Sequence, residues 1–333
     1  MFIVIEGTDA SGKSTLVEEM QRQVEAKHPG RTVEFFHKSK PEEMTRQWVL
    51  QDYVTSIENV TWTKRTAIAD RWHWGEVTYA PLKRPESGSG DGYGLLGIAG
   101  WRWTELFLKS RGVAQFWLYQ PLDVITRRLN GRGDDYIRAD ELETILGLYE
   151  AAAHVGAGLA GKLTPDPDSI SEIPNLARFV LSESSRISKE CIPLADFPEY
   201  IGPRFPKVLL VGDRRSNEDT ILPFMPTEGS SAEFLLSALS AQDWKTTGIV
   251  NGRDTNSHEL DELWHVLGRP KIVALGRNAE RALHAHNFNE DDYIVTSHPR
   301  HVLEFFNSRK TEYGQAISRL ATTTDKEDQW ILR

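Results

Sequence analysis

The residues with the clearest chemical potential form a glycine-rich stretch near the N-terminus, GTDASGKS at residues 7–14. Two glycines separated by four residues and followed by lysine and serine allow backbone amides and a helix N-terminus to surround a polyphosphate. The lysine can reach the outer phosphates, and the serine hydroxyl can bind the bridging magnesium. We therefore expect a site for ATP and Mg²⁺, with Ser14 as the metal ligand, formed by Gly7, Thr8, Asp9, Ala10, Ser11, Gly12, Lys13, Ser14 and Thr15.

Short apolar segments alternate with helical segments on both sides of this stretch. The composition predicts a strand directly before the loop at 2–6 and a helix directly after it at 14–26. Further strands are expected at 32–36, 66–69, 114–118, 207–211, 248–250, 271–275 and 293–295, and a further helix at 139–159. This alternation predicts an α/β fold with parallel sheets.

The length of 333 residues favours two domains. Proline and glycine are frequent from residue 164 to 206, and an apolar strand follows at 207. We expect a first domain at 1–200, a second at 205–333, and a boundary near 203–206. The glycine-rich segment 85–97 is expected to be an irregular loop near the active site.

Composition limits the possible partners and the compartment. The net charge of −9 argues against a broad nucleic-acid-binding surface, so any DNA contact should be confined to a local groove. Candidates for this groove are Arg214, Arg215, Arg253, Arg300 and Arg309. With one cysteine and an apolar start too short for a signal peptide or a membrane span, we expect a cytoplasmic protein without a membrane partner.

The first half resembles the thymidylate kinases. The resemblance rests on FIVIEGTDASGKST at 2–15, on Asp70-Arg71-Trp72 with Thr78-Tyr79 downstream, and on PLDVITRRLNGRGDDYI at 121–137. It implies a P-loop kinase domain with a parallel sheet. It also implies that Asp9 faces the acceptor, Arg71 clamps phosphate, Tyr79 packs by the pyrimidine, and Arg128 or Arg132 supplies lid charge.

The chain also departs from that family. Only about thirty residues separate Pro41 from Asp70, so the acceptor pocket is shortened. Glu76 and Ala80 occupy positions where the family usually carries amides, and Glu76 is a candidate substrate contact. The lid arginines also have a simpler interpretation, as the solvated end of a helix.

The second half resembles the uracil-DNA glycosylases. Segments 208–224, 250–254 and 295–302 follow the order of three motifs of that family, and 271–283 resembles its intervening strand and helix. The resemblance implies that Asp213 lines the base pocket or holds water, Phe224 stacks on a flipped base, Asn251 reads its edge, and His298 stabilises charge. Singly, these residues would be interpreted as core, turn and loop positions. The sequence GDRRSNED replaces the usual glycine- and proline-rich segment, which disfavours glycosylase activity.

Together, the two resemblances suggest an ATP-dependent kinase whose acceptor is a pyrimidine in DNA. The 5-hydroxymethyl group of 5-hydroxymethyluracil offers a suitable hydroxyl, as in viruses such as bacteriophages that hypermodify thymine. An alcohol acceptor benefits from a general base, for which Asp9 and Asp70 are candidates. The alternatives are a kinase for free thymidylate or its hydroxymethyl analogue, an ATP-switched DNA-binding module, and an active glycosylase. The sequence does not set the oligomeric state.

Overall fold

The fold is that of a computed structural model, which describes residues 1–30, 33–38, 43–63, 65–85, 91–132, 137–166, 170–213, 222–252, 255 and 257–320. The chain forms two compact units. The first unit comprises Met1–Gly97 and Arg111–Glu190, and the second comprises Ile98–Ser110 and the chain from Cys191 onward. This division ends the first unit earlier than the expected boundary at 203–206 and assigns one of its internal segments to the second unit.

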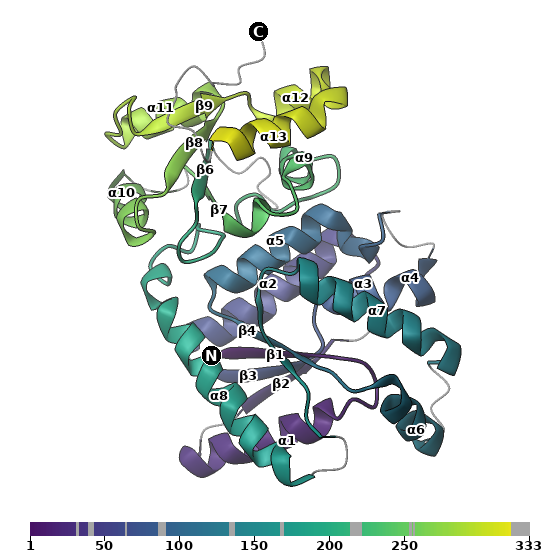
Figure 1. The fold of residues 1–333 in the computed structure, drawn as a ribbon. Coiled ribbons are helices and arrows are strands. Elements are labelled where there is room, and N and C mark those ends of the chain that lie inside the picture. The colour runs from purple at the N-terminus through teal and green to yellow at the C-terminus, as the bar shows by residue number, and fades with distance from the viewer. Residues whose placement is uncertain are drawn as a thin grey trace. The chain divides into compact units, whose positions relative to one another are not determined.

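The first unit contains a five-stranded parallel sheet, which confirms the predicted α/β class (Figure 1). Its strands are β1 (Phe2–Glu6), β2 (Val33–His37), β3 (Thr66–Asp70), β4 (Ala114–Leu118) and β5 (Leu159–Leu163). They lie in the order β2-β3-β1-β4-β5. Strand β1 is central and every one of its residues is buried, as expected for an apolar run in a parallel sheet.

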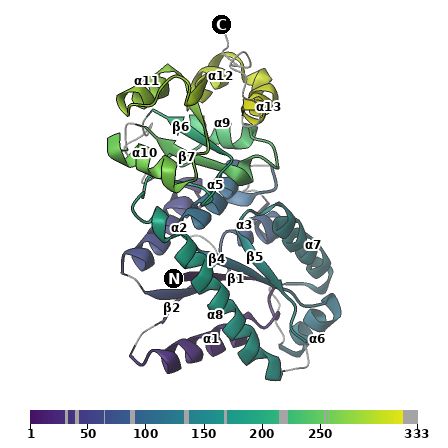
Figure 2. The ribbon, with the colours of Figure 1, turned by 60° about the vertical axis from the view of Figure 1, so that its left-hand side comes forward.

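Helices cover both faces of this sheet (Figures 1 and 2). On one face α1 (Lys13–Lys27) packs beside α8 (Ile173–Glu190), and both contribute to a core with Ile3, Ile68 and Phe116. The other face carries α2 (Arg46–Trp62), α3 (Trp74–Thr78) and α7 (Ala139–Val155). The shorter elements are α4 (Ala80–Lys83), η2 (Gly94–Leu96), α6 (Leu122–Arg132) and η3 (Ile170–Glu172).

Three expectations about the elements were wrong. The helix predicted to reach residue 159 ends at Val155, and β5 follows it. The region from 164 to 206, in which no helix was predicted, contains the 18-residue helix α8. Pro174 lies in the first turn of α8, where a missing amide costs nothing. In the segment 85–97, Gly94–Leu96 forms a 3-10 turn and α5 (Gly97–Ser110) begins at Gly97.

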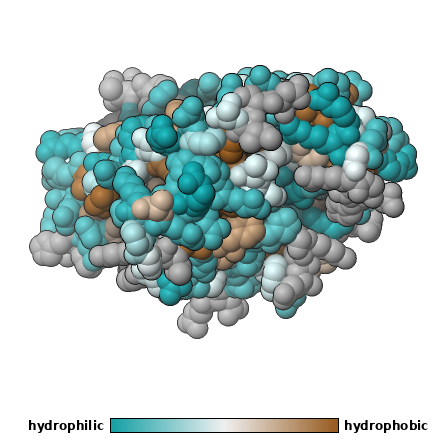
Figure 3. All heavy atoms as spheres, turned by 90° about the horizontal axis from the view of Figure 1, so that it is seen from below, coloured by the Kyte–Doolittle hydropathy of each residue, from teal (hydrophilic) through white to brown (hydrophobic). Residues whose placement is uncertain are grey.

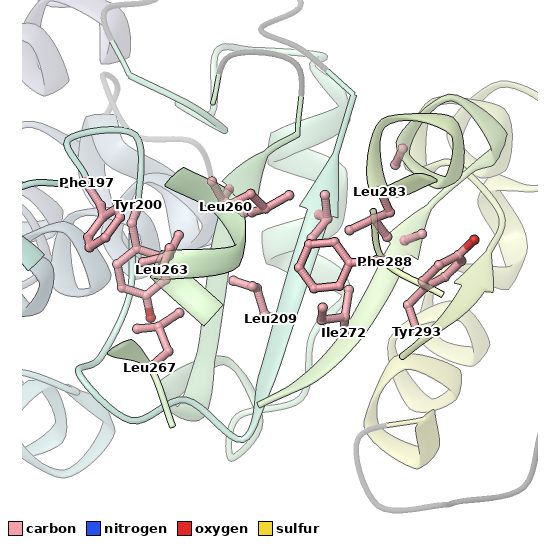
Figure 4. Packing of buried hydrophobic residues seen from close by; sticks show 14 of the residues in the cluster. Phe197, Tyr200, Leu209, Leu260, Leu263, Leu267, Ile272, Leu283, Phe288 and Tyr293 are labelled. Atoms are coloured by element: carbon pink, nitrogen blue, oxygen red, sulfur yellow. The ribbon is translucent and has the colours of Figure 1, made fainter. Parts of the chain in front are cut away.

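The second unit contains a four-stranded parallel sheet in the order β7-β6-β8-β9. These strands are β6 (Val208–Gly212), β7 (Thr247–Asn251), β8 (Lys271–Leu275) and β9 (Tyr293–Thr296). The helices are α9 (Ser231–Ala238), α10 (Ser257–Val266), α11 (Arg277–Ala285), α12 (Pro299–Phe305) and α13 (Lys310–Leu320), with 3-10 turns at η4 (Ile192–Leu194), η5 (Trp244–Thr246) and η6 (Asn307–Arg309). Figure 4 shows the apolar core between the sheet and α10 and α11, where Leu209, Leu263 and Leu283 are fully buried.

Helix α5 belongs mainly to the second unit because of its polar contacts there. The Arg102 guanidinium donates hydrogen bonds to the carbonyl oxygens of Leu236 (2.6 Å) and Leu239 (2.8 Å), at the C-terminal end of α9. A cation at this end of a helix satisfies carbonyls that have no partner within the helix. The Trp103 indole donates to the carbonyl oxygen of Pro223 (3.1 Å).

The face seen in Figure 3 is mainly hydrophilic, with hydrophobic side chains scattered among polar ones. Scattered exposed apolar residues are normal on a protein surface. Within the described ranges, no helix combines the length and the apolar character needed to cross a bilayer.

Candidate functional site

The glycine-rich loop joins the carboxyl end of β1 to α1 and depends on its two glycines. At Gly7, with φ of 151°, an added Cβ would lie 2.6 Å from the carbonyl oxygen of Leu118. Gly12 precedes α1 with φ of 98°, in the left-handed region. The first glycine is therefore required by a close approach to β4 and the second by the backbone turn.

The Lys13 side chain lies inside this loop. Its Nζ donates hydrogen bonds to the carbonyl oxygens of Gly7 (2.9 Å) and Thr8 (2.6 Å). It also lies 3.7 Å from Oδ1 of Asp70, and the side chain is only 5% exposed. An ammonium group is thus held between the loop and the end of β3, where it can meet the outer phosphates of a bound triphosphate.

Two hydroxyl groups in the loop support a ligand that accepts hydrogen bonds. The Thr8 and Ser11 hydroxyls are buried and have no hydrogen-bond partner among the described residues. A buried polar group without a partner is costly, and a bound ligand can supply one. Ser14 is exposed in the first turn of α1.

A magnesium ion fits this donor set. Among the described residues, no group of three or more His, Cys, Asp or Glu side chains could hold a metal. The Mg²⁺ that accompanies a triphosphate needs only one or two protein oxygens, because phosphates and waters complete its coordination. Ser14 can provide one of them, and the ion would then neutralise phosphate charge.

Two residues that are distant in sequence from the loop donate hydrogen bonds to its backbone. The Arg128 guanidinium, from α6, donates to the carbonyl oxygen of Ala10 (3.2 Å). The Tyr149 hydroxyl, from α7, donates to the carbonyl oxygen of Gly7 (3.0 Å). Arg128, to which the resemblance assigned lid charge, therefore contacts the loop, and Tyr149 contacts it without having been predicted. The Arg132 side chain lies outside the described part of the chain.

Asp9, Arg71 and Tyr79, to which the resemblance assigned separate roles in acceptor binding, form one cluster. Arg71 forms an ion pair with Asp9, and its guanidinium carbon lies 4.8 Å from the centre of the Tyr79 ring. The Tyr79 hydroxyl lies 3.4 Å from Oδ2 of Asp9 and accepts a hydrogen bond from the Asp9 amide (3.2 Å). Arg71 has φ of 65°, a strained backbone conformation for arginine that occurs often at functional sites.

Asp70 and His37 lie side by side at the carboxyl ends of β3 and β2. The strand register pairs the two residues, and Nδ1 of His37 lies 3.5 Å from Oδ2 of Asp70. The Asp70 side chain is 9% exposed, whereas that of His37 is 51% exposed. The sequence analysis missed His37. Its position at the last residue of β2 was the available signal, because active sites of parallel sheets lie at the carboxyl ends of strands.

Glu76, a predicted substrate contact, has protein partners in this structure. Its buried carboxylate forms an ion pair with Arg84 (2.6 Å) and accepts a hydrogen bond from the Leu95 amide (3.0 Å). An added Cβ at Gly94 would lie 2.7 Å from the same carboxylate. Glu76 therefore holds the segment around η2 in place.

Glu6, the last residue of β1, is a buried carboxyl group that the sequence analysis did not single out. Its Oε1 accepts hydrogen bonds from the amides of Trp72 (3.0 Å) and Trp74 (3.3 Å). Burial raises the pKa of Glu6 to about 7, although the charges of His73 and Arg71 and the two hydrogen bonds oppose this. Glu6 thus fixes the segment after β3 that carries Arg71.

Replacing Glu6 with glutamine should remove part of the pH dependence of stability. Because the folded-state pKa is raised from 4.5 to about 7, the Glu6 contribution is complete below pH 4.5 and is lost as the pH rises through 7. The loss amounts to about 3 kcal/mol. The free energy of unfolding would be measured in urea at pH 4.5 and at pH 8. Between these two pH values it should fall by about 3 kcal/mol more in the native protein than in Glu6→Gln. The exposed control Glu18→Gln should behave like the native protein, and an unchanged pH dependence in Glu6→Gln would contradict the account.

In the second unit, Phe224 and Asn251 meet over Gly212 at the end of β6. An added Cβ at Gly212 would lie 2.5 Å from Cζ of Phe224 and 2.7 Å from Oδ1 of Asn251. Phe224 is partly exposed with φ of 52°, and Asn251 is the last residue of β7. The Phe224 ring and the Asn251 amide therefore lie next to each other at the carboxyl edge of the sheet.

Asp213 and His298 flank this place. Asp213 directly follows β6 and accepts a hydrogen bond from the Asn278 amide group (3.4 Å). His298 caps α12, with Nδ1 accepting from the Arg300 amide (3.1 Å). Burial lowers the pKa of His298, while the charge of Asp213 opposes this. Asp213, Asn251 and His298 thus lie at or just after the carboxyl ends of β6, β7 and β9, respectively. Phe224 lies against the end of β6.

The predicted basic groove can be followed only in part. Arg214, Arg215 and Arg253 lie outside the described residues. Arg300 is paired with Glu304 (2.5 Å) and Arg309 with Glu312 (2.7 Å) on their own helical segments. These exposed pairs leave the net positive charge of the described part of the groove small.

A cavity of about 790 Å³ lies at the other edge of the first unit's sheet, near the amino ends of β1 and β3. Lys27 and Lys189, which line it, belong to the last turns of α1 and α8. Cations in these positions complement the helix dipoles. The residues that line this cavity are therefore not part of the site at the glycine-rich loop.

Comparison with solved structures finds distant similarity to this chain. No protein-family model matches the chain, and no curated protein matches it. The solved structure of the YorR protein from Bacillus subtilis, in complex with phosphorylated GDP, is 21% identical, with a TM-score of 0.43, over 56% of this chain and 98% of that chain. Deoxyadenosine kinase from M. mycoides with bound dCTP is 17% identical, with a TM-score of 0.35, over 55% of this chain and 99% of that chain.

Proposed function

We propose that the protein is an ATP-dependent kinase that phosphorylates the 5-hydroxymethyl group of 5-hydroxymethyluracil in DNA. The observation that carries the kinase activity is the placement of Lys13 and Arg128 at one glycine-rich loop, beside the Asp9–Arg71 pair. Phosphoryl transfer requires positive charge arranged around an anionic transition state, and these groups supply it. Bound Mg²⁺ would add charge neutralisation at the phosphates.

The acceptor proposal rests on the second unit. Phe224 and Asn251 over Gly212, with Asp213 and His298 beside them, form a set suited to a flipped pyrimidine. An aromatic ring can stack on an extruded base, and an amide can read its edge, which together offset the cost of unstacking. The resemblance of this half to uracil-DNA glycosylases supports the same assignment, with His298 near the base.

A free nucleotide is the second candidate acceptor, and the Asp9–Arg71–Tyr79 cluster favours it. An arginine beside an aromatic ring can bind the phosphate and the pyrimidine of a monophosphate within the first unit. The second unit would then sense pyrimidines rather than present the acceptor.

Labelled ATP separates these possibilities. The protein would be incubated with ATP carrying a labelled γ-phosphate and one of three acceptors. These acceptors are duplex DNA containing 5-hydroxymethyluracil, the free monophosphate, and unmodified duplex DNA. We expect label only in the modified duplex. Label only in the monophosphate would establish the second candidate, and label in none would favour an ATP-switched DNA-binding module. Release of uracil from uracil-containing DNA would establish a glycosylase.

A further inference from the structure

The proposed acceptor is an alcohol, and its proton must leave as the bond to phosphorus forms. Four side chains with proton-accepting atoms lie at the carboxyl ends of β1 to β3, namely Glu6, Asp9, Asp70 and His37. Glu6 is a poor choice because it is completely buried and its Oε1 accepts hydrogen bonds from the amides of Trp72 and Trp74. Asp9 is a poor choice because one of its oxygens is paired with Arg71 and the other lies 3.4 Å from the Tyr79 hydroxyl.

Asp70 is held between two partners. Its Oδ1 lies 3.7 Å from the Lys13 ammonium, and its Oδ2 lies 3.5 Å from Nδ1 of His37. The side chain is also largely buried between β1 and β2. A buried carboxylate beside an imidazole is the arrangement that fixes the tautomer and the orientation of a catalytic histidine.

We propose that His37 is the general base for the acceptor alcohol and that Asp70 is its positioning residue. The proposal rests on the proposed function, because a phosphate acceptor would need no such base. With Nδ1–H directed to Asp70, Nε2 on the opposite side of the ring carries the lone pair. The half-exposed ring can also return a proton to solvent, which a buried carboxylate cannot do easily.

The alcohol oxygen forms a bond to the γ-phosphorus while the bond from that phosphorus to the bridging oxygen breaks, and its electron pair leaves with ADP. The alcohol proton passes to Nε2 of His37, which becomes a cation beside Asp70. The charged neighbours are Asp70 from β3, with Lys13 beyond it, and Lys38, whose amine is held by Asp52 (2.5 Å) and Ser56 (3.1 Å) of α2.

The test compares steady-state rates on the modified duplex for the native protein, His37→Gln, Asp70→Asn and the control His28→Gln. His28 is exposed at the end of α1 and lines the cavity near the amino ends of β1 and β3, at the opposite edge of the sheet from His37. We expect His37→Gln to lower kcat by about a hundredfold with little change in KM, because general bases contribute about 10²- to 10⁴-fold. The pH dependence of kcat should also change, because the variant lacks the proton-accepting side chain.

Chemical rescue separates a base from a structural role. Added imidazole should restore part of the activity of His37→Ala, whereas a misfolded variant would stay inactive. If the native protein phosphorylates modified DNA and His37→Gln has a native kcat and an unchanged pH profile, the general-base proposal is overturned. The proposed function would remain intact in that case. Transfer by the native protein to the free monophosphate alone would overturn both.

Discussion

Replacing Lys13 with alanine should reduce kcat/KM for phosphoryl transfer by about a thousandfold. The ammonium lies within hydrogen-bonding distance of two loop carbonyls and is almost completely buried, so no other side chain can occupy its place without rearrangement of the loop. Without it, the negative charge that develops between the β- and γ-phosphates loses its closest cation. The variant also leaves Asp70 without its ammonium neighbour.

The matched control is Lys27→Ala, which removes an exposed lysine from the last turn of the same helix. It should retain native activity. Both variants should show native circular dichroism, so that a loss of rate reports on catalysis. Activity of Lys13→Ala within tenfold of the native protein would mean that the loop does not bind the transferred phosphate.

The double variant Phe224→Ala, Asn251→Ala should lose about a thousandfold in kcat/KM on duplex DNA containing 5-hydroxymethyluracil. Stacking of one base on an aromatic ring contributes about 1–3 kcal/mol, and a good base-edge contact contributes about 1–3 kcal/mol. Because the ring and the amide lie against the same glycine, their removal eliminates both contributions from one place. The affinity for ATP, measured by titration, should not change.

Phe305→Ala is the control for this variant, because its ring is 67% exposed in the same unit. It should phosphorylate modified DNA at the native rate. If the double variant also did so, the second unit would not select the acceptor, and the Asp9–Arg71–Tyr79 cluster would become the acceptor site.

Local signals predicted the phosphate-binding part of the fold well. The apolar strand, the two glycines and the following helix lie within a few residues of one another, and the structure places β1 and α1 within one residue of expectation. Strand β5 was missed because LAGKL lacks the β-branched and aromatic residues that favour strands. Helix α8 was missed because the prolines at 165, 167 and 174 were given more weight than the helix's buried positions at Ala177, Val180 and Ser184.

The parts of the site that the sequence did not reveal depend on contacts between distant segments. Tyr149 reaches Gly7 across 142 residues, and His37 meets Asp70 only through the register of β2 on β3. The buried environment of Glu6 is likewise set by the segment after β3. No local pattern carries this information. The resemblance to the thymidylate kinases named Asp9, Arg71, Tyr79 and Arg128, and the structure places these residues at the glycine-rich loop; their roles stay predictions.

The most direct test of the central claim is the chemical identity of the product. Duplex DNA containing 5-hydroxymethyluracil would be incubated with the protein, ATP and Mg²⁺, digested to nucleoside monophosphates by nucleases without phosphatase, and analysed by mass spectrometry. We predict a phosphate monoester on the 5-hydroxymethyl group, formed by the native protein and absent with Lys13→Ala. Recovery of only 5-hydroxymethyl-2′-deoxyuridine monophosphate without a phosphate on the hydroxymethyl group, from a preparation that phosphorylates the free monophosphate, would contradict this claim.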